Sequence, residues 1–392
     1  MRIQFSNEQE MIRESARRFL SDACPASLVR AAYESPQVAL GPLWKEMAKL
    51  GWTGLIVPEQ YGGTEAGFQS LAILLEEMGR VCLPVPFFST VVLGGLCLME
   101  LADERHKAEL LPRLVQGDLL LTLALQEGAS EFDRASMTFA ARPDSGGIRV
   151  AGRKFLVPDA QSTDYLVCVA GVEGSTDDGG AYNLVLVPRS KPGVSCAPLH
   201  TITGNSFCEV ICDDVRLNRE AFLNSKPIPW TEIQRVLCKA AVAKSAEMIG
   251  GAQRAMDLAL GYAKERRQFD KPIGAFQAIQ HHCVNMLMQV ESARWLTYRC
   301  VGMIDRGRLK TAYAAVAKAW SNQAYREVIR LAHQVMGGIG YCEDHEMPMY
   351  FRHARQCEAM LGDTDTLLDI IAGEFLDVCP SCVGESRETI LL

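Results

Sequence analysis

The sequence predicts three consecutive regions: a helical region over residues 1–118, a β region over 119–225 and a second helical region over 226–392. Apolar residues recur at helical spacing in the first and last regions. In between they form short runs bounded by glycine- and proline-containing turns, which is typical of strands. The hydrophobic period changes near Leu119 and again near Trp230. A chain of 392 residues is long enough to bury a sizeable core.

Helix signals support the first region. Ser6 and Gln9 have the spacing of a capping box, which satisfies free backbone donors at a helix start. The apolar residues that follow fall on one helical face: Met11, Ile12, Ala16, Phe19 and Leu20. Further helices are predicted over residues 43–50, 70–79 and 104–114, with a turn at Pro58 and Gly62.

Strand-like runs define the second region. They read LLLTLAL, IRVAG, DYLVCVA, NLVLVP and EVICDDV, in this order from Leu119. Turn sequences separate them at residues 146–147, 177–180 and 192–193. About 100 residues of this kind amount to one ordinary domain.

Long helical runs define the third region. Apolar side chains keep helical spacing from Ala246 to Ala263, and two further helices are predicted over residues 277–303 and 311–336. Gly337 and Gly338 end the last of these, as glycine often does after a helix.

Charge and composition exclude some classes of function. The net charge of −7 argues against nucleic acid as the partner, because phosphate backbones require a broad basic face. Residues 81–99 carry no charge, but they contain prolines and glycines, so buried core is expected there and no membrane span.

The 14 cysteines are scattered and MRIQFSNEQE has no apolar signal core, so a cytoplasmic location is expected. Cys379 and Cys382 lack a second pair, so no metal site is predicted.

A basic stretch, KERRQFDKPIGAFQAIQHH, begins at Lys264 between two predicted helices. Arg266 and Arg267 lie beside Phe269, and a proline and a glycine follow. Two interpretations suit this pattern: a solvated surface loop, or a site that binds a phosphate-bearing ligand through guanidinium groups.

Three strings in this order resemble the acyl-CoA dehydrogenase family over almost the whole chain. They are IVPEQYGG from Ile56, RRQFDKPIGAFQAIQ from Arg266 and HQVMGGIGY from His333. The resemblance implies an α-helical N-domain, a β-barrel-like middle domain and a four-helix-bundle C-domain. It also implies an FAD enzyme of the fatty-acid β-oxidation type, which removes hydrogens from Cα and Cβ of an acyl-CoA thioester. Electron-transfer flavoprotein would accept the electrons.

The resemblance assigns cofactor roles to several residues. Arg266 corresponds to the arginine that reaches the FAD pyrophosphate of a neighbouring subunit, and Gln268 and Phe269 correspond to positions that touch the same cofactor. Gln334 and Gly338 match positions that hold the adenosine end. Glycine permits close backbone approach, although Gly337 and Gly338 also suit a plain helix end.

The catalytic base of the family is missing from this sequence. Its usual glutamate position, just before a Gly-Thr pair, holds Leu361, and Asp363 replaces the threonine. A smaller branch takes its base from an earlier helix, at a position that falls on Ala240. An alkyl side chain cannot accept the α-proton. Asp363, Asp365 and Glu232 are the remaining candidates for a base.

The positions around the flavin ring also depart from the family. The Trp-Ile-Thr that contacts the ring corresponds to Leu156, Val157 and Pro158, and proline offers neither a hydroxyl nor an N–H. Gln126 stands at a threonine position and could donate to a flavin carbonyl. The sequence ASEFD at residues 129–133 replaces a small, glycine-rich turn.

Residues for a neighbour's FAD are thus retained, whereas those for the chain's own ring and base are lost. This pattern favours one subunit of a hetero-oligomer in which a sister acyl-CoA dehydrogenase subunit supplies the base. Three alternatives remain open: a divergent homo-oligomer with another base, a catalytically silent scaffold subunit, or a flavoenzyme of this fold with changed chemistry.

Overall fold

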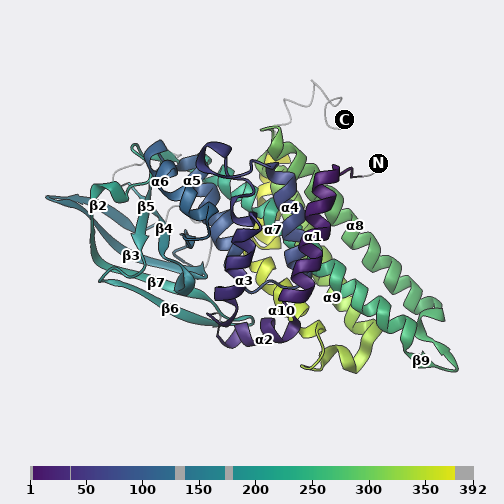
Figure 1. Ribbon diagram of the computed structural model, residues 1–392. Helices are drawn as coiled ribbons and strands as arrows, with labels where there is room; N and C mark the ends of the chain where they lie inside the picture. Colours follow the sequence, from purple (N-terminus) through teal and green to yellow (C-terminus); the bar gives the residue numbers. More distant parts are fainter. Residues whose placement is uncertain (1–2, 36, 129–136, 173–179, 376–392) are drawn as a thin grey trace, which may run out of the picture.

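The structure, a computed structural model, describes residues 3–35, 37–128, 137–172 and 180–375. It consists of a helical N-terminal region, a sheet in the middle and a helical C-terminal region (Figure 1). The fold class predicted from the sequence is therefore confirmed. The last helix before the sheet ends at Val115, the first strand begins at Leu121, and the long helix after the sheet begins at Trp230.

The N-terminal region consists of short helices. Ser6 caps the first helix: its hydroxyl accepts from Gln9 N at 3.2 Å, and the Gln9 side chain accepts from Ser6 N at 3.0 Å. The uncharged run contains a buried π-helical segment, Phe88–Gly94, as expected for core. The α-helices are α1 Asn7–Ala23, α2 Ala26–Glu34, α3 Gln37–Lys49, α4 Gly67–Arg80, α5 Gly95–Leu101 and α6 Glu104–Val115.

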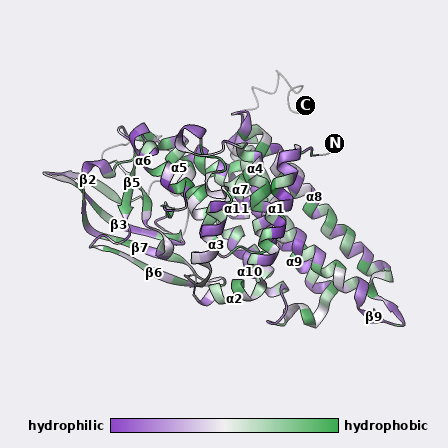
Figure 2. Cartoon of the chain, viewed as in Figure 1, coloured by the Kyte–Doolittle hydropathy of each residue, from purple (hydrophilic) through white to green (hydrophobic). Residues whose placement is uncertain are grey.

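The middle region is a sheet with its own apolar core (Figure 2). Its strands follow the order β6-β7-β3-β2-β4-β5-β8, and β1 pairs with β4 in parallel. Alternate side chains of β3 and β7 point into the core, which holds Phe139, Val150 and Val210. The strands are β1 Leu121–Ala124, β2 Ala140–Asp144, β3 Gly147–Pro158, β4 Tyr165–Gly171, β5 Ala181–Pro188, β6 Val194–Thr201, β7 Gly204–Leu217 and β8 Ile228–Pro229.

Three long helices dominate the C-terminal region: α7 Trp230–Glu265, α8 Gln277–Asp305 and α9 Thr311–Met336. Two shorter helices follow, α10 Met347–Ala359 and α11 Thr364–Phe375. A hairpin of β9 Arg267–Gln268 and β10 Lys271–Pro272 joins α7 to α8 at the end of the molecule farthest from the sheet (Figure 1). Cys379 and Cys382 lie outside the described residues.

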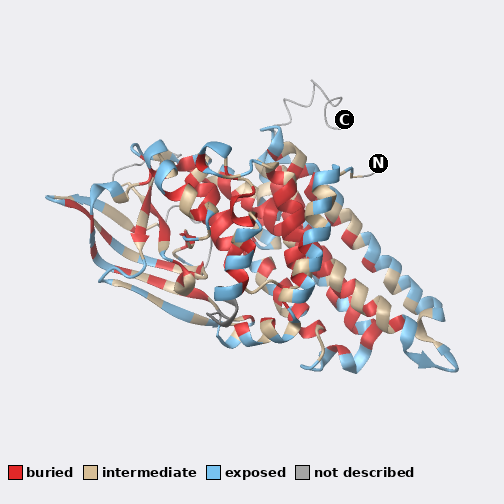
Figure 3. Cartoon of the chain, in the orientation of Figure 1, coloured by how far each residue is buried: buried red, intermediate tan, exposed pale blue. Residues whose placement is uncertain are grey.

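Glycines bring α4 and α7 into backbone contact. A Cβ on Gly79 would lie 1.8 Å from the Glu247 carbonyl oxygen, and a Cβ on Gly250 would lie 1.8 Å from that of Glu76. Both positions therefore exclude any larger residue, and the two helical regions share one continuous buried core (Figure 3). None of the described helices combines the length and the apolar character that crossing a membrane requires.

Candidate functional site

A cavity of about 180 Å³ lies where the sheet meets the C-terminal helices. Its wall contains Gln126, the stretch from Leu156 to Pro158, and Leu361. The structure therefore brings together the residues that the sequence analysis placed at the flavin ring and at the catalytic base, although they come from three separate segments. The rest of the wall is largely apolar and includes Leu93, Leu123, Phe207, Leu237 and Met360.

A bulge in β3 places Leu156 in this wall. Lys154 pairs with Val210 and Val157 pairs with Cys208, so Phe155 and Leu156 have no partner in the pairing of β3 with β7. The Phe155 N–H donates instead to the Gln126 carbonyl at 2.7 Å. Leu156 adopts a φ of 51°, a left-handed conformation that is unfavourable for leucine. Such strain is typical of sites where the surroundings impose the geometry.

Leu361 is held in a similar way at the end of α10. Its φ is 58°, and the next residue, Gly362, has a φ of 98°. The buried Lys318 ammonium group donates to the Cys357 carbonyl at 2.9 Å and to the Gly362 carbonyl at 3.3 Å. The backbone at Leu361 is thus held by hydrogen bonds, and the side chain that it presents to the cavity is an alkyl group.

The other candidate bases lie away from this cavity. Asp363 is exposed, and its carboxylate accepts from Thr366 N at 2.8 Å, which holds its pKa below the usual range. Asp365 is exposed and Glu232 lies in the first turn of α7. Ala240 is buried and does not line the cavity. No aspartate or glutamate among the described residues lines this cavity.

Gln126 and Glu127 are engaged in local contacts. The Gln126 amide donates to the Gly128 carbonyl at 2.7 Å. The Glu127 carboxylate accepts from the Lys154 ammonium at 2.7 Å and from Phe139 N at 3.0 Å. Burial alone would raise the pKa of Glu127, but the Lys154 ammonium and hydrogen bonds from Thr138 hold it below the usual value. Glu127 therefore joins the end of β1 to β3 and is not available as a base.

A second cavity, of about 100 Å³, adjoins the first and shares Pro158, Thr203, Gln356 and Met360 with it. Its wall is unusually polar and includes Ser89, Asp159, Lys244, Glu247 and His353. The sequence analysis missed this group. The available signal was the pair Lys244 and Glu247, two charges one helical turn apart within the otherwise apolar run AAVAKSAEMIGG.

The charged groups of this second cavity are paired with one another. The Lys244 ammonium lies 2.6 Å from Glu247 Oε2 and 3.6 Å from the centroid of the Phe88 ring. The other carboxylate oxygen of Glu247 lies 2.9 Å from His353 Nε2. Both oxygens of Glu247 are therefore occupied, which makes it a poor proton acceptor for a substrate.

Asp159 has a single side-chain partner among the described residues: the Ser89 hydroxyl donates to Oδ2 at 2.6 Å. Burial raises the pKa of Asp159 to about 6. The pKa of Asp159 in the folded state thus exceeds its pKa of about 3.9 in the unfolded state. At pH values between these two pKa values, the native state binds more protons than the unfolded state does. Stability is therefore lost as the pH rises through this window.

We expect Asp159→Asn to stabilise the protein at pH 8, because the amide avoids the cost of a buried charge. The gain should be up to about 3 kcal/mol, since one pKa unit corresponds to about 1.4 kcal/mol. It should shrink toward zero near pH 4. Urea unfolding at several pH values measures it, with the exposed Asp213→Asn as the control. A gain that is independent of pH would contradict this prediction.

The residues assigned to a neighbour's FAD lie elsewhere. Arg266 directly follows α7 and is exposed, and Phe269 at the hairpin tip is 86% exposed. Phe269 and Asp270 have φ values of 52° and 63°, as in tight hairpin turns with two left-handed residues. The hairpin projects away from the sheet (Figure 1), and none of its residues lines either cavity. These side chains are therefore accessible at the surface of the chain.

Gln334 and Gly338, at the end of α9, are also exposed. The residues of the chain consequently suit the phosphate and adenosine end of FAD better than they suit the flavin ring. Exposed guanidinium and amide groups suit the phosphates and the adenosine end. On the ring side, Pro158 has no donor and the Gln126 amide is engaged with Gly128. Residues 129–133 lie outside the described residues.

Comparison with known proteins identifies the family. The acyl-CoA dehydrogenase N-terminal domain matches residues 6–118, and the acyl-CoA dehydrogenase C-terminal domain matches residues 230–376. The chain belongs to the acyl-CoA dehydrogenase family. Its relatives are oxidoreductases that act on CH–CH bonds, so the predicted enzyme class is confirmed.

Two relatives cover nearly the whole chain. The probable acyl-CoA dehydrogenase YngJ of Bacillus subtilis is 28% identical over 384 residues, which are 96% of this chain and 100% of that protein. The caffeyl-CoA reductase-Etf complex subunit CarC of Acetobacterium woodii is 28% identical over 378 residues, which are 95% and 99% of the two proteins.

Two solved structures show the same acyl-CoA dehydrogenase fold. The Tcur3481-Tcur3483 steroid ACAD has a TM-score of 0.80 and 28% identity, and the match covers 93% of this chain and 96% of that one. The FAD complex of PigA has a TM-score of 0.87 and 23% identity, with 95% and 99% covered. The prediction of an FAD protein is confirmed at the level of the family.

Proposed function

We propose that this chain is one subunit of a hetero-oligomeric, FAD-dependent acyl-CoA dehydrogenase whose sister subunit supplies the catalytic base. One observation carries the proposal: the cavity around Leu361 has no carboxylate among the described residues, whereas Arg266 and its neighbours are exposed at the surface. A catalytically silent scaffold subunit would share the first feature but has no need of the second.

In this proposal the chain's own residues bind and position the cofactor of the sister subunit. Arg266 neutralises phosphate charge, while Gln268 and Phe269 pack and hydrogen-bond beside it. These residues would hold FAD, which would supply the hydride-accepting chemistry of the reaction. The α-proton goes to a carboxylate of the sister subunit, because Leu361 and Ala240 cannot take it. Electron-transfer flavoprotein is the proposed acceptor, and the caffeyl-CoA reductase-Etf complex supports this choice.

The surface of the chain supports association with another subunit. Large apolar side chains are exposed along α8: Val284, Leu287, Met288 and Trp295. Their spacing places them along one side of the helix. The Tcur3481-Tcur3483 steroid ACAD, whose name joins two proteins, supports a paired assembly. A cytoplasmic location and a role in fatty-acid β-oxidation belong to the same proposal.

Flavin content tests the proposal. The chain should be purified alone, and also after co-expression with an acyl-CoA dehydrogenase homologue encoded beside it. We expect little FAD in the chain alone, and FAD with a yellow colour in the co-purified assembly. Stoichiometric FAD in a homo-oligomer of this chain would contradict the paired assembly.

We expect Arg266→Ala to weaken FAD retention in the assembly. Loss of a charge-assisted contact of this kind costs about 1.5–3 kcal/mol, or roughly ten- to hundred-fold in affinity. Flavin fluorescence released on dilution measures the affinity. Lys264→Ala is the matched control, because Lys264 is an exposed cation two residues earlier. Equal retention in both variants would refute the role of Arg266.

A further inference from the structure

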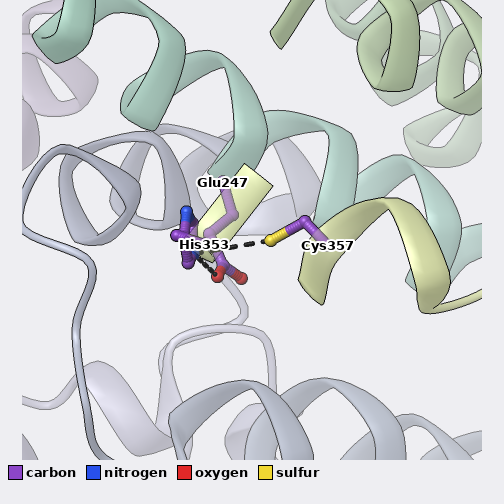
Figure 4. A group of neighbouring side chains, drawn as sticks. All are labelled: Glu247, His353 and Cys357. Atoms are coloured by element: carbon purple, nitrogen blue, oxygen red, sulfur yellow. Dashed lines mark hydrogen bonds and ion pairs between the residues drawn. The ribbon is translucent and has the colours of Figure 1, made fainter. Parts of the chain in front are cut away.

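A group of metal-ligand side chains lies in the wall of the second cavity. Glu247 on α7 and His353 and Cys357 on α10 bring a carboxylate oxygen, an imidazole nitrogen and a sulfur within 4.8 Å of one another (Figure 4). His353 and Cys357 are one helical turn apart, so their side chains lie on the same face of α10. His353 and Cys357 are buried.

The distances suit a tetrahedral ion. His353 Nε2 lies 2.9 Å from Glu247 Oε1 and 3.4 Å from Cys357 Sγ. Zinc binds nitrogen and oxygen at about 2.0–2.2 Å and sulfur at about 2.3 Å, so tetrahedral ligands lie roughly 3.3–3.6 Å apart. An outward shift of a few tenths of an ångström would therefore open this group around an ion.

The surrounding groups orient the ligands. The Tyr325 hydroxyl lies 3.1 Å from His353 Nδ1. In the tautomer in which Nδ1–H donates a hydrogen bond to this hydroxyl, the Nε2 lone pair is available to a metal. Lys244 contacts only the second oxygen of Glu247, so an ion would insert between Oε1 and His353 Nε2 and replace their direct contact. Zn²⁺ with one thiolate and one carboxylate is neutral overall, and Asp159 in the same cavity offsets the charge of Lys244.

We propose that Glu247, His353 and Cys357 form a zinc site at the wall of the second cavity. Three protein ligands leave the fourth position facing the cavity, where water can complete a tetrahedron. The sequence analysis predicted no metal site because Cys379 and Cys382 lack a second pair. It did not find this group, whose ligands Glu247 and His353 lie more than 100 residues apart. This site is independent of the proposed function, since it uses none of the residues assigned to FAD or to the base.

Metal analysis of the untagged full-length protein, grown with added zinc and desalted, tests the site. We expect about one zinc ion per chain in the wild type, and background levels in Cys357→Ser and His353→Gln. Cys97→Ser, which removes another buried thiol outside the cavity, should keep its zinc. Zinc in the wild type at the level of Cys357→Ser, even after incubation with zinc, would overturn the proposal.

Cobalt substitution provides a second measurement if the variants fold poorly. Wild-type protein stripped with a chelator and loaded with Co²⁺ should show d–d bands to the red of flavin absorption, as tetrahedral thiolate-bound cobalt does. The same protein loaded with Zn²⁺ in place of Co²⁺ is the control and should not show these bands. A cobalt-loaded wild type without such bands would also overturn the site.

Discussion

The isolated chain, reconstituted with FAD, should turn over acyl-CoA about 10²- to 10⁴-fold more slowly than its assembly with a sister subunit. This is the contribution that a positioned general base typically makes. The residue at the usual base position is Leu361, and no aspartate or glutamate of the described chain lines the same cavity. Dye reduction with fatty, branched, aromatic and steroid acyl-CoA thioesters measures the difference.

A paired substitution at Leu361 tests the physical reason for this loss. Leu361→Glu places a carboxylate on a backbone that Lys318 already holds in position, so it should raise the turnover of the isolated, reconstituted chain. Leu361→Gln has the same length but cannot accept the proton, so it should stay at the wild-type level. Equal turnover of the two variants would show that the missing base is not what limits the isolated chain.

The largest loss of stability is expected from Glu127→Gln. The Lys154 side chain is fully buried and that of Glu127 is 7% exposed, and their charges lie 2.7 Å apart. Removing one partner of a buried ion pair typically costs about 3–5 kcal/mol, because the other charge stays buried without compensation. The amide keeps an acceptor for the backbone donors of Thr138 and Phe139, so the loss reports mainly on the charge.

The matched control for this prediction is Glu327→Gln, which breaks the surface pair of Glu327 with Arg330. A surface ion pair contributes about 0–1 kcal/mol, so little should change. Urea unfolding followed by circular dichroism compares the two variants. A loss in Glu127→Gln as small as that of the control would mean that Lys154 finds another partner or sheds its proton.

Local signals explain how much of the fold the sequence could predict. The capping box at Ser6, the uncharged run around Phe88 and the period change near Trp230 each depend on neighbouring residues, and each corresponds to an observed element. The position of Leu361 in the site follows from a short motif at the end of a helix. Its left-handed backbone and its anchoring by Lys318 do not, because Lys318 lies on another helix.

The remaining features depend on contacts between distant segments. The bulge that places Leu156 at the cavity is set by pairing with β7, more than 50 residues later. The wall of the polar cavity contains Asp159 after the end of β3, Lys244 on α7 and His353 on α10. Each residue alone resembles an ordinary polar position, so only the folded chain reveals the group. Sequence patterns could therefore point to residues that line the first cavity but not to the polar cavity beside it.

Anaerobic mixing of acyl-CoA with the FAD-loaded chain tests the split site most directly, because single-turnover bleaching of the flavin needs no external acceptor. The experiment compares the chain alone with the chain assembled with its sister subunit, at equal flavin concentration. We expect bleaching in the assembly and none by the chain alone on the same timescale. Rapid bleaching by the chain alone would show that it holds its own base and would contradict the paired active site.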